Sequence, residues 1–195
     1  MWDPHFDLLQ FVVKINFSPK KRKIHTGPNL TNEDIPSKVP DILTRRSILS
    51  IVNGIYDPEG LAAPFVVKAK ILLRRLTIGK FEWDEPIPND ERDRWANLFT
   101  EMFEMEQIKF HRSTKPHDAF GEPTLVVFCD ASENAFGACA YIRWEKSDTF
   151  ESRLLMAKSR IAPMKRITIP RLELNAALIA ARMKDFIEKE TSMKF

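Results

Sequence analysis

Residues 125–142 read LVVFCDASENAFGACAYI, and residues 168–177 read TIPRLELNAA. The first stretch predicts a β-hairpin, because an apolar run, a polar turn at 131–134 and a second apolar run follow one another. The second stretch predicts the start of a helix, since Pro170 has no backbone N–H to lose in a first helical turn. A small antiparallel sheet with one helix is therefore expected in this part of the chain.

Two acidic residues stand at the ends of these predicted elements. Asp130 closes the first strand, and Glu173 lies in the first turn of the helix. Taken singly, Asp130 would suit a turn and Glu173 would suit the positive end of a helix dipole. Hard cations such as Mg²⁺ prefer oxygen ligands, and paired carboxylates offset their charge. The joint placement of the two acids favours a functional origin.

The overall composition is that of a globular protein. The 195 residues are 44% hydrophobic and 29% charged, which fits one large or two small domains. The net charge of +3 is too small by itself to indicate a nucleic-acid partner. The two cysteines form neither a disulfide framework nor a zinc spacing, so they are expected to be buried thiols in a reducing compartment. No signal peptide or membrane span is visible, so neither secretion nor a membrane partner is expected.

Periodicity predicts the remaining elements. Residues 11–17 alternate like a half-buried strand, and residues 151–159 form a third strand after the hairpin. Helices are expected from residue 41 or 44 to residue 56, then on to about residue 76, and from a cap at Asn89 or Asp90. The last of these carries a core-facing stripe, namely Trp95, Leu98, Phe99, Met102 and Phe103. The final helix is expected to face the sheet, beside Val127 or Phe128, through Leu172, Ala176, Ile179, Met183 and Ile187.

Basic residues offer candidate contacts with phosphate groups. A run of four, Lys20 to Lys23, lies in a turn-rich stretch, where it suits either phosphate binding or a solvated loop. Lys68 and Arg75 are seven residues apart and therefore share one face of a predicted helix. A helix bundle with a merely soluble surface would show the same pattern. The choice between these readings stays open at this level.

Four blocks, in the order in which they occur along the chain, resemble the Pol polyprotein of BEL/Pao-type LTR retrotransposons. They are LTRRSILS at 43–50, YDPEGLAAP at 56–64 and the two stretches quoted above. The resemblance covers nearly all of the chain and implies three regions. These are the end of a reverse transcriptase palm with a strand pair and basic loop (1–42), a helical thumb and connection (43–120), and the N-terminal part of a ribonuclease H-like domain (121–195).

The resemblance also implies a fold and an activity. The fold would be α+β, with a helical segment followed by a truncated ribonuclease H-like, antiparallel three-stranded sheet with one packed helix. Asp130 and Glu173 match the family's catalytic and metal-binding acids, and Mg²⁺ or Mn²⁺ would bind only in a complete domain. A third aspartate belongs to a later strand, so the 195 residues are expected to be inactive alone. The chain looks like a piece of a longer one.

The implied partners are an RNA–DNA hybrid or template–primer duplex and the rest of the polyprotein, in a cytoplasmic virus-like particle or the nucleus. The candidate nucleic-acid contacts are Lys20, Lys21, Arg22, Lys23, Lys68, Arg75, Ser132 and Asn134. One alternative is a non-enzymatic retroelement remnant or protein-interaction module. Another is an aspartic-type peptidase, because this region of Pao-type polyproteins carries a peptidase family label. The chain has neither Asp-Thr-Gly nor Asp-Ser-Gly, and it lacks the Tyr-x-Asp-Asp of a polymerase centre.

Overall fold

The chain folds into two compact units. A computed structural model describes residues 1–22 and 24–195, with the side chain of Lys20 left out. The first unit comprises Met1, Gln10–Tyr56 and Lys68–Lys109, and the second comprises Trp2–Leu9, Asp57–Val67 and Phe110–Phe195. Each unit is thus assembled from separate segments of the sequence. The architecture is α+β, as predicted.

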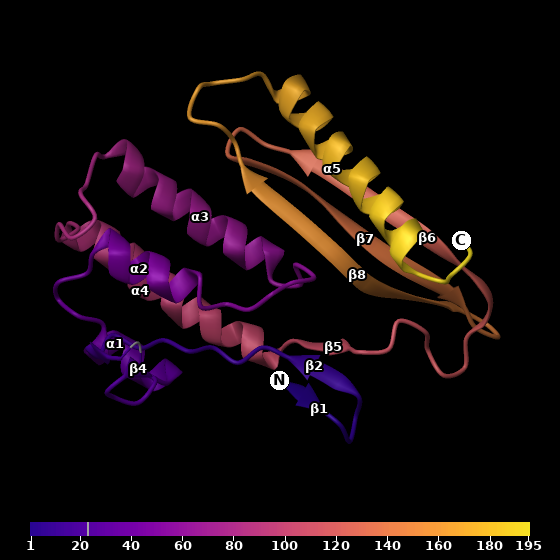
Figure 1. Ribbon diagram of the computed structural model, residues 1–195, viewed down its shortest axis with the longest axis horizontal. Coiled ribbons are helices and arrows are strands. Elements are labelled where there is room, and N and C mark those ends of the chain that lie inside the picture. Colours follow the sequence, from indigo (N-terminus) through magenta and orange to yellow (C-terminus); the bar gives the residue numbers. More distant parts are fainter. Residues whose placement is uncertain (23) are drawn as a thin grey trace. The chain divides into compact units, whose positions relative to one another are not determined.

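The first unit is mainly helical (Figure 1). Its elements are β3 (Lys20–Lys21), β4 (Ile24–His25), η1 (Asn32–Asp34), α1 (Ile35–Lys38), α2 (Arg45–Val52), α3 (Ala63–Ile78, within this unit from Lys68 on), α4 (Asn89–Glu104) and η2 (Met105–Gln107). The core is built around α4, where Trp95, Leu98, Phe99 and Met102 are buried. The predicted stripe is therefore confirmed at these four positions.

Local chemistry sets where the helices begin and end. Thr44 caps α2, because its hydroxyl accepts a hydrogen bond from the backbone N–H of Ser47 at 3.3 Å. The helix ends at Val52, short of the predicted residue 56, and the N–H of Gly54 turns back to the carbonyl of Ile51. The predicted cap of α4 was wrong: the cap position belongs to Pro88, which makes no side-chain cap hydrogen bond.

The N-terminal strand was predicted in the wrong place. Hydrogen-bonded strands lie at β1 (Trp2–Asp3), β2 (Leu8–Gln10) and β5 (Lys109–His111), which form a small sheet in the order β1-β2-β5. Residues 11–17 contribute only a single bridge, between Ile15 and Leu30. Val13 and Ile15 are buried nonetheless. The alternation of apolar residues in this stretch therefore indicates which side chains are buried, and it does not indicate strand pairing.

The second unit contains the predicted sheet and helix. Strands β6 (Phe120–Ala131), β7 (Ala135–Glu145) and β8 (Phe150–Ile161) form an antiparallel sheet in that order. Helix α5 (Ile169–Glu190) lies along this sheet (Figure 1). Its sequence places Pro170 in the first turn, as expected. The three-stranded sheet with one packed helix is thus confirmed.

Helix α5 packs on the sheet through a small aliphatic core. Ala138 and Ala140 of β7 are buried together with Met183 and Ile187 of α5, and Val127 packs against them. Alanine side chains on β7 leave room for the larger helix residues, which is how the two layers interlock. Of the two predicted strand partners, Val127 is confirmed, whereas Phe128 is wrong because it is 58% exposed. Leu172 and Ala176 are also buried, and Ile179 is only partly buried.

A bulge and a glycine shape the outer side of β8. Ala140 pairs with Met156 and Tyr141 pairs with Leu154, so Leu155 is an extra residue that packs toward α5. The N–H of Ala157 donates to the carbonyl of Glu59 at 2.8 Å. Gly60, with φ of +79°, lies so close to this strand that a Cβ atom would collide with Ala157.

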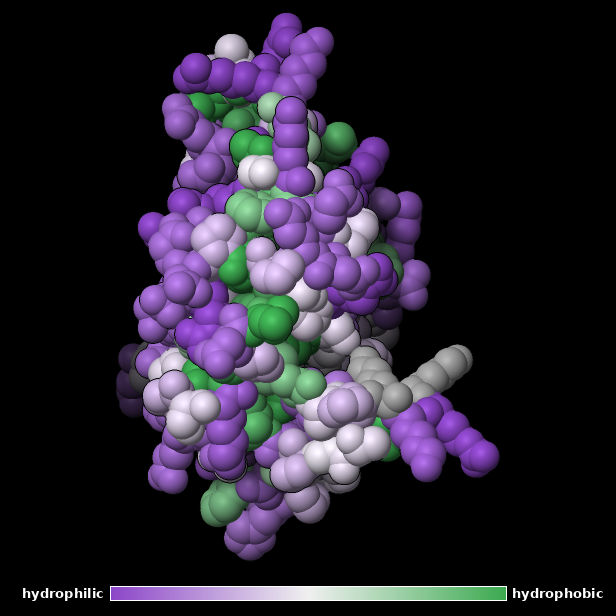
Figure 2. All heavy atoms as spheres, turned by 90° about the vertical axis from the view of Figure 1, so that its left-hand side faces the viewer, coloured by the Kyte–Doolittle hydropathy of each residue, from purple (hydrophilic) through white to green (hydrophobic). Residues whose placement is uncertain are grey.

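This contact lies at the edge of the sheet beyond β8. Residues 59–60 cover part of β8, whereas no backbone hydrogen bond from any described residue reaches the outer edge of β6. Figure 2 shows a face of the molecule on which hydrophilic side chains predominate and hydrophobic ones appear between them. Of the helices in the described ranges, none has the length and apolar character to cross a membrane.

Candidate functional site

The two predicted catalytic acids lie at the same end of the sheet. Asp130 is the last residue but one of β6 and pairs with Gly137 of β7, and Glu173 lies near the start of α5. The arrowhead of β6 and the first turn of α5 come to the same end of the sheet in Figure 1. Both side chains are exposed. The fold therefore leaves both carboxylates accessible to a ligand.

The two acids approach this end from different sides. Val127 packs toward α5, and successive side chains of a strand alternate between faces. Asp130, three residues further on, therefore belongs to the face opposite α5. Its Oδ1 accepts a hydrogen bond from the N–H of Ala131 at 2.8 Å. A group contacting both Asp130 and Glu173 would have to lie beyond the strand end or around its edge.

The described residues do not provide a full set of metal ligands. No group of three or more His, Cys, Asp or Glu side chains capable of holding a metal ion occurs in residues 1–22 and 24–195. A two-metal site of the ribonuclease type needs several carboxylates around ions that are about 4 Å apart. Asp130 and Glu173 supply at most two. These donors fit part of a metal site and fall short of a complete one.

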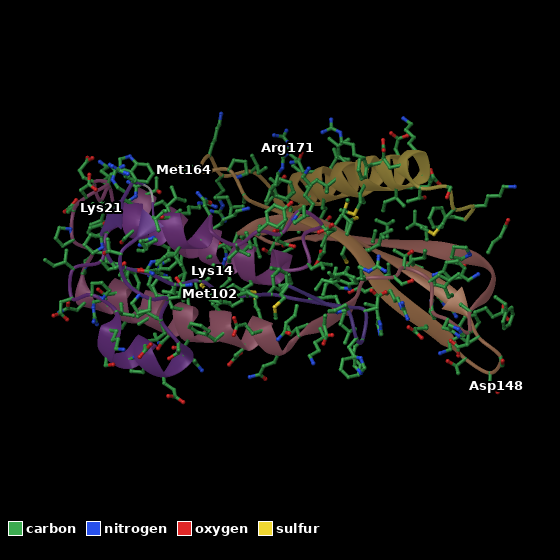
Figure 3. All side chains as sticks on the ribbon, turned by 60° about the horizontal axis from the view of Figure 1, so that its bottom comes forward. Lys14, Lys21, Met102, Asp148, Met164 and Arg171 are labelled. Carbon is green, nitrogen blue, oxygen red and sulfur yellow. The ribbon has the colours of Figure 1, made fainter. Side chains whose placement is uncertain are left out.

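Two acids further along the sheet and α5 do not fill the gap. Asp148 lies in the turn between β7 and β8, and Figure 3 shows it at the far end of the sheet from Arg171, where α5 begins. The length of β7 separates it from Asp130 by about 35 Å. Asp185 is held by Lys189 at 2.8 Å. Neither can serve as the third ligand.

The turn residues that were predicted to contact nucleic acid have a local role. The Ser132 hydroxyl accepts hydrogen bonds from the N–H groups of Asn134 and Ala135, and it donates to the carbonyl of Ala135 at 3.2 Å. The carbonyl of Asn134 accepts from the N–H of Ala162 at 2.8 Å. The Ser132 side chain thus stabilises the hairpin turn. Both residues are exposed, and their contact with nucleic acid stays a prediction.

The predicted basic pair on α3 is engaged with acids of α4. Lys68 forms an ion pair with Glu101, and Nη2 of Arg75 lies 3.0 Å from Oε1 of Glu91. The Glu91 side chain is only 11% exposed, so its interaction with Arg75 is only weakly screened by water. These pairs neutralise the two cations locally. Their role in nucleic-acid binding stays a prediction.

The described part of the basic run near the N-terminus lies at the end of β3 and in the turn after it. Lys21 ends β3, and Arg22 adopts a φ of +51° in the turn that leads to β4. Both are exposed. Lys23 and the side chain of Lys20 lie outside the described residues. For Lys21 and Arg22, the solvated-loop and phosphate-binding interpretations both agree with this geometry.

The cysteines were predicted to be buried, which is wrong for Cys129. This thiol is exposed near the end of β6, next to Asp130. Cys139 on β7 is partly buried, and burial raises the pKa of its thiol. The buried part of β6 therefore ends before Phe128, and residues 128–130 of the strand face solvent.

Sequence reasoning missed three basic residues close to the carboxylate end. Lys158 and Arg160 lie on β8, and Arg171 lies in the first turn of α5, where Figure 3 shows it. All three are exposed. Their spacing along β8 would have placed Lys158 and Arg160 on one face, but only the strand register shows which face that is.

Two comparisons bear on this fold and site. The family model for the Pao retrotransposon-like RNaseH-like domain matches residues 44–195. The match includes both Asp130 and Glu173, together with helices α2 to α5 and strands β6 to β8. Curated proteins yield no match.

Proposed function

Because the chain belongs to the Pao retrotransposon-like RNaseH-like domain family, we propose that it binds an RNA–DNA hybrid as part of a retrotransposon Pol polyprotein during reverse transcription. One structural observation supports the proposal most directly: two exposed carboxylates, Asp130 and Glu173, come to one end of a three-stranded sheet that carries a single packed helix. The family description is that of a ribonuclease H-like domain, which gives no support to the peptidase alternative.

Hydrolysis of the RNA strand belongs to a more complete domain. A divalent cation would supply the Lewis-acid chemistry, and Asp130 and Glu173 would provide part of its ligands. Two carboxylates bind Mg²⁺ weakly, since this ion gives up its water reluctantly and usually depends on substrate phosphates as further ligands. Residues 1–195 alone are therefore expected to bind the hybrid without cleaving it.

Binding is tested with a labelled RNA–DNA hybrid of mixed sequence, titrated with the protein at several salt concentrations. We expect log K to fall linearly with log salt, because cations of the protein that contact phosphates release counterions. Hybrids of unrelated sequence should bind alike, since phosphate contacts carry no base information. Absence of binding at low salt would reject the proposal.

Cleavage is tested with the same hybrid in Mg²⁺ and in Mn²⁺. The wild-type protein should show no more product than the Asp130→Asn variant. Asp148→Asn is the matched control, since it removes an equal charge at the opposite end of the sheet. Turnover by the wild type and Asp148→Asn that disappears in Asp130→Asn would show that residues 1–195 already form a working site.

A further inference from the structure

We infer that Lys158, Arg160 and Arg171, here called the basic strip, hold the sugar-phosphate backbone of the bound nucleic acid. This inference rests on the proposed function and names the surface that would perform it. The strip lies in the second unit, at the end of the sheet where β8 finishes and α5 begins. Nothing in the family match assigns a role to these residues.

The register of the sheet places two members of the strip on one face. Lys158 pairs with Ala138, and Arg160 pairs with Phe136. Directly opposed residues of neighbouring strands project from the same face, and Ala138 belongs to the core beneath α5. Lys158 and Arg160 therefore lie on the α5 side of the sheet, roughly 7 Å apart along the strand. Both are exposed, so α5 leaves this part of β8 uncovered.

The third member joins the strip through the connection between β8 and α5. The loop starts at Ala162, whose N–H is bonded to the Asn134 carbonyl in the hairpin turn, and the helix begins a few residues later. Arg171, labelled in Figure 3 in the first turn of α5, therefore lies at the end of the sheet where β8 carries Arg160. The strip flanks the end of the sheet that carries Asp130 and Glu173.

The charges of the strip are not neutralised by any residue in the described part of the chain. Across the described ranges, no ion pair or side-chain hydrogen bond is recorded for Lys158, Arg160 or Arg171. The neighbouring Arg166 differs, because its Nη2 lies 4.0 Å from Glu133. An unpaired cation can bind a phosphate without first breaking an internal ion pair. The strip therefore complements the charge of a polyanionic backbone better than the paired residues of α3 do.

The test compares two charge-matched double variants in the hybrid-binding titration. Lys158→Ala with Arg160→Ala should weaken binding about tenfold near 0.1 M salt and reduce the salt slope by about two. Lys68→Ala with Arg75→Ala removes the same net charge, and because both of these cations are ion-paired it should reduce affinity and slope less than the β8 variant does. Arg171→Ala should reduce the slope by about one. The swapped variant, Lys158→Arg with Arg160→Lys, should keep the wild-type slope.

The outcomes separate the inference from the proposed function. If the wild type binds but Lys158→Ala with Arg160→Ala leaves both affinity and slope unchanged, the basic strip is wrong and hybrid binding stands. A larger loss in the α3 variant than in the β8 variant would also overturn the strip. If the wild type itself does not bind, the proposed function fails and the strip fails with it. Thermal unfolding of each variant checks folding, and Lys158→Gln with Arg160→Gln replaces the alanine variant if that one is destabilised.

Discussion

Two pairs of exposed cations, Lys68 and Arg75 on α3 and Lys158 and Arg160 on β8, have different surroundings. In the first unit, Lys68 and Arg75 of α3 are paired with Glu101 and Glu91 of α4. In the second unit, the basic strip on β8 and α5 faces solvent without a recorded acid partner among the described residues. Both regions look equally basic along the sequence. The difference shows that the charge available to a ligand depends on the partners that the fold supplies.

The largest effect is expected from a substitution in the core that holds α5 on the sheet. The docking of α5 matters for the comparison because Arg171 of the basic strip lies in the first turn of this helix. Met183 is 4% exposed and lies in the core with Ala138 and Ala140. Met183→Ala should lower the free energy of unfolding by about 2–5 kcal/mol. The matched control on the same helix is Leu174→Ala. Because Leu174 is 71% exposed, this substitution should lower the free energy of unfolding by less than about 0.5 kcal/mol. If chemical denaturation gives the same loss of unfolding free energy for Met183→Ala and Leu174→Ala, the packing of α5 described above is contradicted.

The next largest effect is expected when Lys68 is released from its ion pair, so that it resembles the unpaired cations of the basic strip. Glu101→Gln removes the partner of Lys68 and should increase hybrid affinity about threefold, with a salt slope steeper by up to about one. Glu104→Gln on the same helix makes the same change in net charge without releasing an ion-paired cation, so it should have a smaller effect on the slope. Equal slopes for the two variants would show that pairing does not withhold Lys68 from the nucleic acid.

The smallest effect concerns acid stability within the second unit. The hydrogen bond from Arg153, and then that from Lys146, lower the pKa of Glu151 below its ordinary value. A lowered folded-state pKa stabilises the protein above the unfolded pKa of about 4.3, and this contribution is lost as the pH falls through the folded value. Between about pH 5 and pH 3, the melting temperature of the wild type should therefore fall more steeply than that of Glu151→Gln. The control Glu145→Gln, on the neighbouring strand, should show the same pH dependence of the melting temperature as the wild type. If it instead behaves like Glu151→Gln, the hydrogen bonds of Glu151 to Arg153 and Lys146 have no specific role in acid stability.

Much of the second unit could be predicted from local patterns. The hairpin turn at residues 132–134 and the start of α5 follow from turn chemistry and from Pro170, which act within a few residues. The faces of α4 and α5 follow from the helical period, as the burial of Phe99 and Met183 shows. The strand predicted at residues 11–17, which needed a partner from elsewhere in the chain, failed. Residues 11–17 alternate correctly for burial, but their backbone pairs at only one position.

The carboxylate end shows the same limit. Its position at the end of a strand could be predicted, because Asp130 follows an apolar run. The face on which Asp130 lies could not, because a shift of one residue in register moves every side chain to the other face. Cys129 was expected inside, and it does pair with Ala138 on the α5 side, but α5 leaves this strand end exposed. Packing against α5 decides which face of the strand is buried, and the strand's own residues do not specify that face.

The sequence by itself determined the sheet and helix of the second unit, their order and the placement of Asp130 and Glu173 at element ends, because periodicity, turns and helix starts depend on neighbours along the chain. Only the tertiary structure decided which cations keep their charge. Glu101 and Glu91 reach Lys68 and Arg75 across separations of 33 and 16 residues. Among the residues that the structure describes, Lys158 and Arg160 meet no acid, because α5 leaves that part of β8 uncovered. Ion pairing is a property of distance in space, and the fold alone sets that distance.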